Sequence, residues 1–284
     1  MGAGMSARQE LDALFDQTKS LAGQPRTISE LSGGLTNRNY QVITPDGAFV
    51  ARISSGGSEL LAIDRDCEYR NSVTAAAAGA GAPVVEYRPQ DRLLVIGYIE
   101  GRTFEAADVA AAANIPRIAQ ACRRLHNGAR FGNDFDMFAI QRRYLSVARS
   151  RGFKIPAGYD DLLPANFIDD GERIWLIDYE LSGNNDACFE LGNIGAEAHL
   201  SDEALAALVA AYYGRPRRSK IARARLLGGL IGMYGWTLWG AIQHAASPID
   251  FDFWSWAMAR FEGAARGLTA KDFTTLLGDV QRDD

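Results

Sequence analysis

Cysteine and histidine are scarce in this sequence, which holds three of each among its 284 residues. Cys67, Cys122 and Cys188 lie far apart, and no C-x-x-C pair occurs. A disulfide framework or a Cys/His zinc site would need more ligands at closer spacing, so the sequence favours neither. This use of cysteine is typical of the reducing cytosol, and we expect a cytoplasmic location.

The sequence also lacks an excess of positive charge. Lys and Arg number 30 against 35 Asp and Glu, which gives a net charge of -5. A protein that binds nucleic acid by broad neutralisation of phosphates would be basic. We therefore expect a small-molecule partner and no nucleic acid.

Long apolar segments are limited to the uncharged run 226–242, whose seventeen residues reach only the lower limit of a membrane-spanning length. Five of these residues are glycine. A core helix that packs closely through glycine is the expectation here, with no membrane insertion. The first residues show neither the basic nor the apolar region of a secretion signal.

With 47% hydrophobic residues, the chain can bury a large core, as one large domain or as two lobes around a cleft. Ser6 and Gln9 have the spacing of a capping box that begins a packing helix. Beyond residue 104 the pattern becomes helical, and His126 ends one predicted helix as a structural histidine. Between these regions, alternating apolar residues predict strands near 28–31, 40–44, 48–53, 84–87 and 93–96.

Two acidic residues and an asparagine indicate the chemistry. Asn166 follows Asp161 by five residues, and Asp178 ends the apolar run 174–177. Phosphoryl transfer needs a carboxylate that orients the attacking hydroxyl and two oxygen ligands for Mg²⁺, which keeps several waters and takes few protein ligands. Residues 169–172 favour a turn, so a hairpin would bring Asn166 beside Asp178. We therefore predict Asp161 as the catalytic residue, and Asn166 and Asp178 as metal ligands.

The residues around these positions carry a family resemblance. D-L-L-P-A-N-F at 161–167, L-I-D-Y-E at 176–180 and F-E-L-G-N at 189–193 resemble the choline/ethanolamine kinase family. Relatives of that family are the aminoglycoside phosphotransferases and, more distantly, the protein kinases. The resemblance extends from about Leu31 to Phe261.

The resemblance implies an α+β chain with a bilobal, protein kinase-like fold, in which a small antiparallel-sheet N-lobe precedes a mainly helical C-lobe. We expect the N-lobe at 1–97, a hinge at 98–103 and the C-lobe at 104–284. ATP and Mg²⁺ are the implied cofactors. In such a fold, backbone groups near Tyr98 and Ile99 would bind adenine.

The glycines between the first two predicted strands allow backbone N–H groups to approach a phosphate that a Cβ would block. Such a glycine pair is often only a turn. The motif G-G-L-T-N at 33–37 also resembles the nucleotide loop of the family, although it does not match the protein-kinase G-x-G-x-x-G. We predict that the nucleotide is bound by Ser32, Gly33, Gly34, Thr36 and Asn37.

Arg52 lies in the apolar strand pattern V-A-R-I, where protein kinases place a lysine that holds the α- and β-phosphates. A guanidinium supplies the same charge with a bidentate fork. Glu68, on the following predicted helix, is the expected partner. Two unrelated surface residues are the alternative, but an unpaired charge in an apolar strand would be costly, so we favour the ion pair.

Aromatic residues near the carboxyl end predict an acceptor pocket. Trp236 and Trp239 share a helical face, and Trp256 follows in a second aromatic group. Aromatic faces beside a carboxylate such as Glu180 can hold a quaternary ammonium, although burial as core is the alternative for each tryptophan. The spacing resembles the carboxyl end of choline kinases, whereas Leu181 replaces an aromatic residue, which leaves room for ethanolamine or another amino alcohol.

One departure concerns the segment before Leu162. Relatives have a further helix and a short strand with a histidine there, about twenty residues in total, and the histidine position is Tyr159 here. Either the segment is genuinely shortened, or the printed sequence joins the two sides of a segment that the protein possesses. The intact pattern after Leu162 favours the second explanation, in which case Asp161 belongs upstream and the catalytic aspartate is missing.

Three functions remain open. The leading hypothesis is an ATP- and Mg²⁺-dependent kinase that phosphorylates the hydroxyl of choline, ethanolamine or a similar amino alcohol. An aminoglycoside or sugar phosphotransferase would keep the chemistry but need a broad acidic cleft. The third is a non-catalytic, pseudokinase-like binding protein, motivated by Tyr159. The sequence leaves open whether the protein forms a homodimer.

Overall fold

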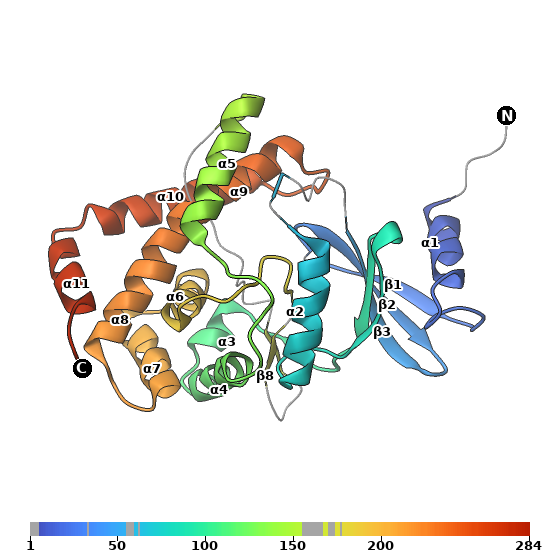
Figure 1. Cartoon of the computed structure of the whole chain (residues 1–284), viewed down its shortest axis with the longest axis horizontal. Coiled ribbons are helices and arrows are strands. Elements are labelled where there is room, and N and C mark those ends of the chain that lie inside the picture. Colours follow the sequence, from blue (N-terminus) through green and yellow to red (C-terminus); the bar gives the residue numbers. More distant parts are fainter. Residues whose placement is uncertain are drawn as a thin grey trace.

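The computed structural model describes residues 6–32, 34–54, 60–61, 63–154, 167–169, 174–176 and 178–284. A β-sheet occupies one end of the molecule and helices occupy the other (Figure 1). The five predicted strands before residue 97 and the mainly helical pattern after about residue 104 are confirmed. The domain boundaries at 97 and 103 remain a prediction.

The N-terminal sheet is antiparallel throughout. The turn between its second and third strands consists of Pro45 and Asp46, and Thr44 pairs with Gly47 across it. This short turn fixes the register between the two strands that it joins. In spatial order the five strands are β1 (Thr27–Leu31), β2 (Asn37–Thr44), β3 (Gly47–Ser54), β5 (Leu93–Gly97) and β4 (Val84–Arg88).

Helix α1 (Ala7–Asp16) packs on this sheet. The Ser6 hydroxyl accepts the Gln9 N–H over 3.3 Å, and the Gln9 side chain accepts the Ser6 N–H over 2.8 Å, so the predicted capping box is confirmed. Phe15 and Leu21 are fully buried against apolar side chains of β2, β3 and β5. This apolar cluster holds α1 and the segment after it against the sheet.

Helix α2 (Arg65–Ala77) lies between the sheet and the helical part of the molecule (Figure 1). Asp64 caps its first turn by accepting the N–H groups of Asp66 and Cys67. Its buried face is polar, since Glu68, Asn71 and Ser72 are buried there. Buried polar side chains need partners, and those of Glu68 lie in the candidate site.

A second, small sheet joins the helical part, in the order β6 (Arg102–Thr103), β7 (Phe167–Asp169) and β8 (Ile174–Leu176). Phe167 pairs with Leu176 and Asp169 with Ile174, which confirms the predicted hairpin over its described residues. The helices are α3 (Ala106–Ala110), α4 (Ile115–His126), α5 (Met137–Arg151), α6 (Ala187–Glu197), α7 (Asp202–Tyr213), α8 (Arg218–Ala224), α9 (Met233–Ala246), α10 (Phe253–Leu268) and α11 (Phe273–Val280).

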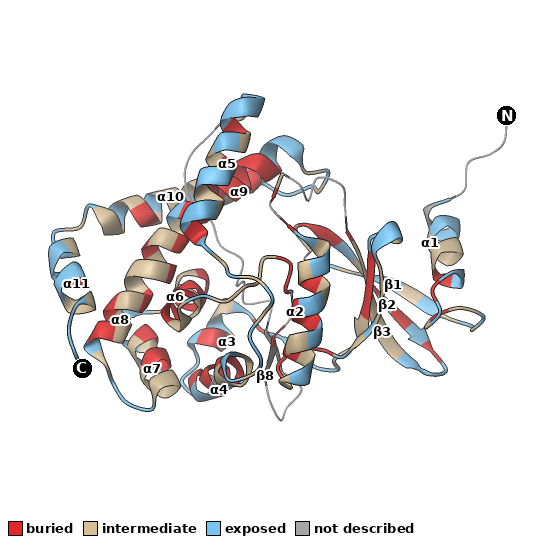
Figure 2. Cartoon of the chain, viewed as in Figure 1, coloured by how far each residue is buried: buried red, intermediate tan, exposed pale blue. Residues whose placement is uncertain are grey.

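The two larger apolar clusters among the described residues support the helical part. One lies among α4, α6 and α7, and the other joins α5, α9 and α10. Figure 2 shows that α6 and α9 are buried over most of their length, while α11 carries mainly exposed and intermediate residues. Helix α9 is therefore held on several sides, which makes it a rigid support for side chains that face the site.

The uncharged run 226–242 is a buried helix, as predicted. A π-helical stretch, η3 (Arg225–Gly232), joins α8 to α9. A Cβ on Gly228 would lie 2.2 Å from the carbonyl oxygen of Phe189, and one on Gly192 would lie 2.0 Å from that of Ala224. Only glycine permits helices to approach this closely. Among the described residues, no helix has the length and apolar character to cross a bilayer.

Candidate active site

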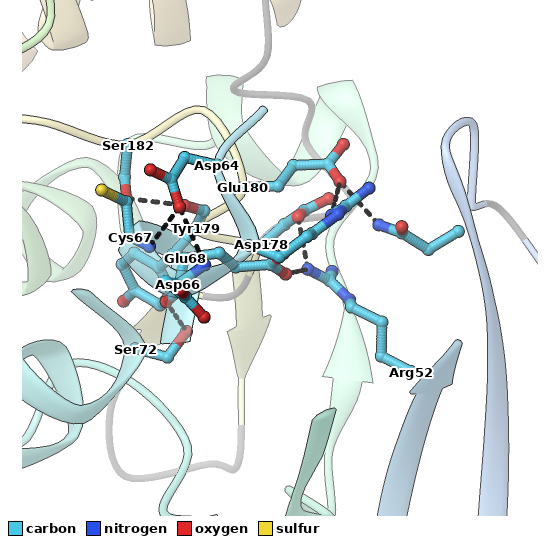
Figure 3. A network of polar contacts seen from close by, with 12 residues as sticks. Arg52, Asp64, Asp66, Cys67, Glu68, Ser72, Asp178, Tyr179, Glu180 and Ser182 are labelled. Atoms are coloured by element: carbon cyan, nitrogen blue, oxygen red, sulfur yellow. Dashed lines mark hydrogen bonds and ion pairs between the residues drawn. The ribbon is translucent and has the colours of Figure 1, made fainter. Parts of the chain in front are cut away.

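Three side chains from distant parts of the chain meet between the sheet and the helices (Figure 3). Nη1 of Arg52, on β3, donates to Glu68 Oε1 of α2 over 2.7 Å and to Asp178 Oδ1 over 2.7 Å. The predicted Arg52–Glu68 ion pair is therefore confirmed. Burial disfavours the charged guanidinium, but the carboxylates of Asp178 and Glu68 outweigh it and raise the pKa of Arg52.

Glu180 joins the same network from the segment after β8. Its Oε2 accepts a hydrogen bond from Asn37 Nδ2 over 2.7 Å and one from Arg65 Nη1 over 2.9 Å. Arg65 also donates to Glu68 over 2.7 Å. Burial opposes the charge of Arg65, but the carboxylates of Glu180 and Glu68 raise its pKa. The Glu180 side chain is only 1% exposed. Both partners of its carboxylate, Asn37 and Arg65, belong to the N-terminal part of the chain.

The network carries an excess of negative charge. Two guanidinium groups, of Arg52 and Arg65, face the carboxylates of Glu68, Asp178 and Glu180, whose oxygens lie within 4.8 Å of one another. Burial, and then the neighbouring carboxylates, raise the pKa of Glu180. A hard divalent cation would relieve this repulsion, and carboxylate oxygens are the ligands that Mg²⁺ prefers. The residues present therefore fit a magnesium ion at Asp178, the most exposed of the three carboxylates at 24%.

The candidate phosphate loop connects β1 to β2. Ser32 is exposed at its start, and Thr36 and Asn37 are buried at its end. A Cβ on Gly34 would lie 2.3 Å from the carbonyl oxygen of Asn37, so the turn requires glycine at this position. Gly33 lies outside the described residues. The structure thus brings the end of the loop beside Glu180, while nucleotide contacts of the loop remain a prediction.

The segment after β5 leads from the five-stranded sheet to β6 of the small sheet. The backbone N–H of Tyr98 donates to the carbonyl of Ala48 over 3.0 Å, which extends the pairing of β3 with β5. Tyr98 and Ile99 are both half-buried. Adenine contacts at these two residues remain a prediction.

The three predicted acceptor tryptophans belong to one apolar cluster. Trp236 and Trp239 on α9 are 2% and 3% exposed, and Trp256 on α10 is half-buried. The rings of Trp239 and Trp256 lie 5.1 Å apart, and Trp236 stacks on Phe135 at 5.6 Å. The structure therefore brings the aromatic side chains together, and their burial agrees with the alternative of core packing.

A cation already lies against one of these rings. The guanidinium of Arg260 is 4.7 Å from the centroid of Trp256. Its Nε donates to Glu197 Oε1 over 2.8 Å. This ring face is occupied by a paired side-chain cation, so it is the least available of the predicted surfaces for a ligand.

A cavity of about 310 Å³ connects the two candidate regions. Asp178 lines it, as do the aromatic side chains of Phe135, Phe189 and Trp236 and the aliphatic side chain of Leu181. Polar and charged side chains, among them His126, Asp186 and Glu190, line the cavity as well. A small pocket that combines apolar walls with polar groups is the usual form of a small-molecule site. Of the predicted acceptor tryptophans, Trp236 is the one that lines this cavity together with Asp178.

His126 has the structural role that was predicted. Its Nε2 forms an ion pair with Glu190 of α6, and its Nδ1 lies 2.7 Å from the hydroxyl of Tyr212 on α7. Burial disfavours the imidazolium, but the Glu190 carboxylate favours it and the net effect raises the pKa of His126. The residue thus ties the end of α4 to two neighbouring helices.

Two of the predicted residues with direct roles in the chemistry, Asp161 and Asn166, lie outside the described residues, as does Tyr159. Both assignments therefore remain predictions. Sequence reasoning missed two further residues, Arg65 and Gln243. Arg65 stands three residues before Glu68, a helical spacing that could have indicated their contact. No local signal indicated that Gln243 Nε2 donates to the carbonyl of Leu35 over 2.9 Å.

Known phosphotransferases and kinases resemble this chain. Residues 27–152 match the phosphotransferase enzyme family. Protein LicA of Haemophilus influenzae is 26% identical over 269 residues, which cover 83% of this chain and 78% of that protein. Ethanolamine kinase 1 of Homo sapiens is 25% identical over 303 residues, which cover 84% of this chain and 66% of that protein.

The likeness extends to three dimensions. A crystal structure of a choline/ethanolamine kinase family protein from Mesorhizobium loti superposes with a TM-score of 0.81 and is 28% identical. The superposition covers 96% of this chain and 99% of that chain. The bilobal fold expected from the sequence resemblance is thereby confirmed.

Proposed function

We propose that this chain, an alcohol phosphotransferase related to the choline/ethanolamine kinases, transfers the γ-phosphate of ATP to the hydroxyl of an amino alcohol such as ethanolamine or choline. The observation that carries the proposal is the contact of Arg52 with both Glu68 and Asp178. It joins a cation suited to phosphates and a carboxylate suited to Mg²⁺ within one buried network.

Arg52 holds the phosphates of the nucleotide in this proposal. Its guanidinium is oriented by Glu68 on α2 and keeps its charge, because the surrounding carboxylates raise its pKa. A fixed, charged fork can bind two phosphate oxygens at once. The carbonyl of Tyr98 and the backbone of Ile99 would bind adenine, since the N–H of Tyr98 is used by Ala48.

Asp178 and Asn166 would hold the magnesium ion, and Asp161 would orient the acceptor hydroxyl. When bound, the ion supplies positive charge that stabilises the charge developing on the transferred phosphate. Asp178 lies at the edge of the cavity, whereas Glu68 and Glu180 are buried behind it. This difference in exposure supports Asp178 as the carboxylate that faces the nucleotide.

The cavity would receive the amino-alcohol head. Trp236 presents an aromatic surface on the same cavity as Asp178, and cation–π contact with an ammonium contributes roughly 0.5–2 kcal/mol. Trp239 and Trp256 would support this wall from behind, because they lie in the same apolar cluster. Leu181 makes another wall aliphatic, so that wall offers no cation–π contact to the trimethylammonium of choline and leaves room for ethanolamine or another amino alcohol.

A coupled assay of ADP release tests the proposal. The purified protein is incubated with ATP and Mg²⁺ and with each of choline, ethanolamine, aminoglycosides and simple sugars. We expect ADP release that depends on an amino alcohol. Release with aminoglycosides or sugars alone would select the second phosphotransferase hypothesis, and Mg·ATP binding without release in any mixture would select the pseudokinase hypothesis.

A further inference from the structure

The candidate phosphate loop, residues 32–37, is attached to the helical part of the molecule at two points. Asn37 Nδ2 donates to Glu180 Oε2 over 2.7 Å, and Gln243 Nε2 donates to the carbonyl of Leu35 over 2.9 Å. Asn37, Glu180 and Gln243 are 5%, 5% and 6% exposed. Water therefore competes weakly for these hydrogen bonds, and each one holds the loop in place.

Glu180 is itself held firmly. Arg65 Nη1 donates to the same Oε2 that accepts from Asn37, and it donates to Glu68 as well. Glu68 in turn accepts from Arg52, which donates to Asp178. One charged network thus connects the end of the phosphate loop to the proposed metal ligand (Figure 3).

Gln243 links the loop to a second region. It lies on α9, four residues after Trp239 and seven after Trp236, so the three side chains follow one face of the helix. Helix α9 is packed against α5 and α10 and is buried over its central turns. The helix that carries the proposed acceptor aromatics therefore also anchors the phosphate loop.

We propose that Glu180 and Gln243 are positioning residues for the nucleotide, which hold the phosphate loop against the helical part without contacting either substrate. The inference rests on the proposed nucleotide site. Backbone N–H groups bind a phosphate well only when they are already oriented, and a loop fixed by two buried contacts avoids the cost of ordering on binding. Glu180 then serves nucleotide affinity, in contrast to the acceptor role predicted from the sequence.

Calorimetric titration with Mg·ADP tests this directly, without the need for turnover. Asn37→Ser and Gln243→Met each remove one anchor and leave the buried charges paired. Since a hydrogen bond to a charged partner is the stronger kind, we expect Asn37→Ser to weaken binding about tenfold and Gln243→Met about threefold or more. Glu180→Ala should weaken binding at least as much as Asn37→Ser.

A double variant shows whether Asn37 and Glu180 act through their shared hydrogen bond or whether each substitution weakens binding by a separate route. If Asn37 and Glu180 act through one hydrogen bond, Asn37→Ser with Glu180→Ala should bind within about twofold of Glu180→Ala alone. Should Glu180→Ala fail to fold, judged by circular dichroism and thermal unfolding, Glu180→Met replaces it, because methionine keeps the volume and removes the carboxylate acceptor. If the losses of Mg·ADP affinity in the two single variants multiply in the double variant, the two residues act independently and the assigned contact is overturned.

Glu30→Gln is the matched control, because Glu30 pairs with Arg38 on the adjoining strands but is exposed. Its Mg·ADP affinity should equal that of the wild type. In turnover, the positioning variants should raise the KM for ATP and leave the KM for the acceptor within about twofold. Variants with a raised acceptor KM and an unchanged Mg·ADP affinity would overturn the inference. If the wild type itself binds no Mg·ADP, both the inference and the proposed function are overturned.

Discussion

Asp178 has an unusual backbone conformation, with a φ of 71° in the left-handed region. Only a few per cent of non-glycine residues adopt it, and Asp and Asn do so more readily than others. Its carboxylate accepts a hydrogen bond from Arg52 over 2.7 Å. Outliers of this kind concentrate at functional sites, which supports the role proposed for Asp178.

At the residue scale, we predict that Asp178→Asn lowers kcat by at least about a hundredfold, because a metal ion contributes several kcal/mol to the transition state. Asn tolerates the left-handed backbone, so the fold should be retained. Steady-state kinetics with thermal unfolding checks this. Asp202→Asn, at an exposed position of α7, is the control and should behave as the wild type. Full activity of Asp178→Asn would remove Asp178 from the metal site.

Helices α4, α6 and α7 meet at the ion pair of His126 with Glu190. Because the folded-state pKa of His126 is raised above its ordinary value of 6.5, the folded protein binds this proton more tightly than the unfolded chain. The resulting stabilisation is complete below the unfolded-state pKa. It is lost as pH rises through the folded-state pKa.

At the element scale, we predict that the stability difference between the wild type and His126→Gln is larger at pH 5.5 than at pH 8.5. Urea denaturation at both pH values measures the difference. His244→Gln, at an exposed position on α9, provides the comparison and should not reproduce this pH dependence. A difference that is the same at both pH values would show that the ion pair does not stabilise the packing of these helices.

Hydrogen bonds and an ion pair across the site join the sheet to the helical part. Asn37 with Glu180, Leu35 with Gln243 and Arg52 with Asp178 all connect residues more than 120 positions apart. Loss of either part would leave buried charged groups without partners, which is costly. The two parts should therefore unfold together.

At the scale of the whole molecule, we predict one thermal transition that Mg·ADP shifts upward. A ligand at a hundredfold its Kd adds about 2.7 kcal/mol of stability, which corresponds to roughly 5–10 °C for a protein of this size. Scanning calorimetry with and without ligand measures the shift. Excess EDTA should remove most of it. Two separate transitions, with only one sensitive to the nucleotide, would show that the two parts are independent.

Much of the site was predictable because its signals are local. The strand that carries Arg52, the helix that carries Glu68 and the hairpin before Asp178 follow from periodicity and turn residues within short segments. An unpaired charge in an apolar strand is costly wherever it lies, and the protein-kinase pattern pairs a cation at this position with a helix glutamate, so the pair of Arg52 with Glu68 could be inferred from the sequence.

What the sequence by itself determined is the order of strands and helices, the types of residue at the site and the close packing of the glycine-rich helix. The tertiary structure decided which partner each buried polar group takes. Glu180 was predicted to supply negative charge beside the acceptor aromatics, a role that stays a prediction, and the structure shows that its carboxylate contacts Asn37 and Arg65. Such partners are separated by 115 to 208 positions along the chain. No local propensity encodes them, because they depend on how the sheet and the helices pack together.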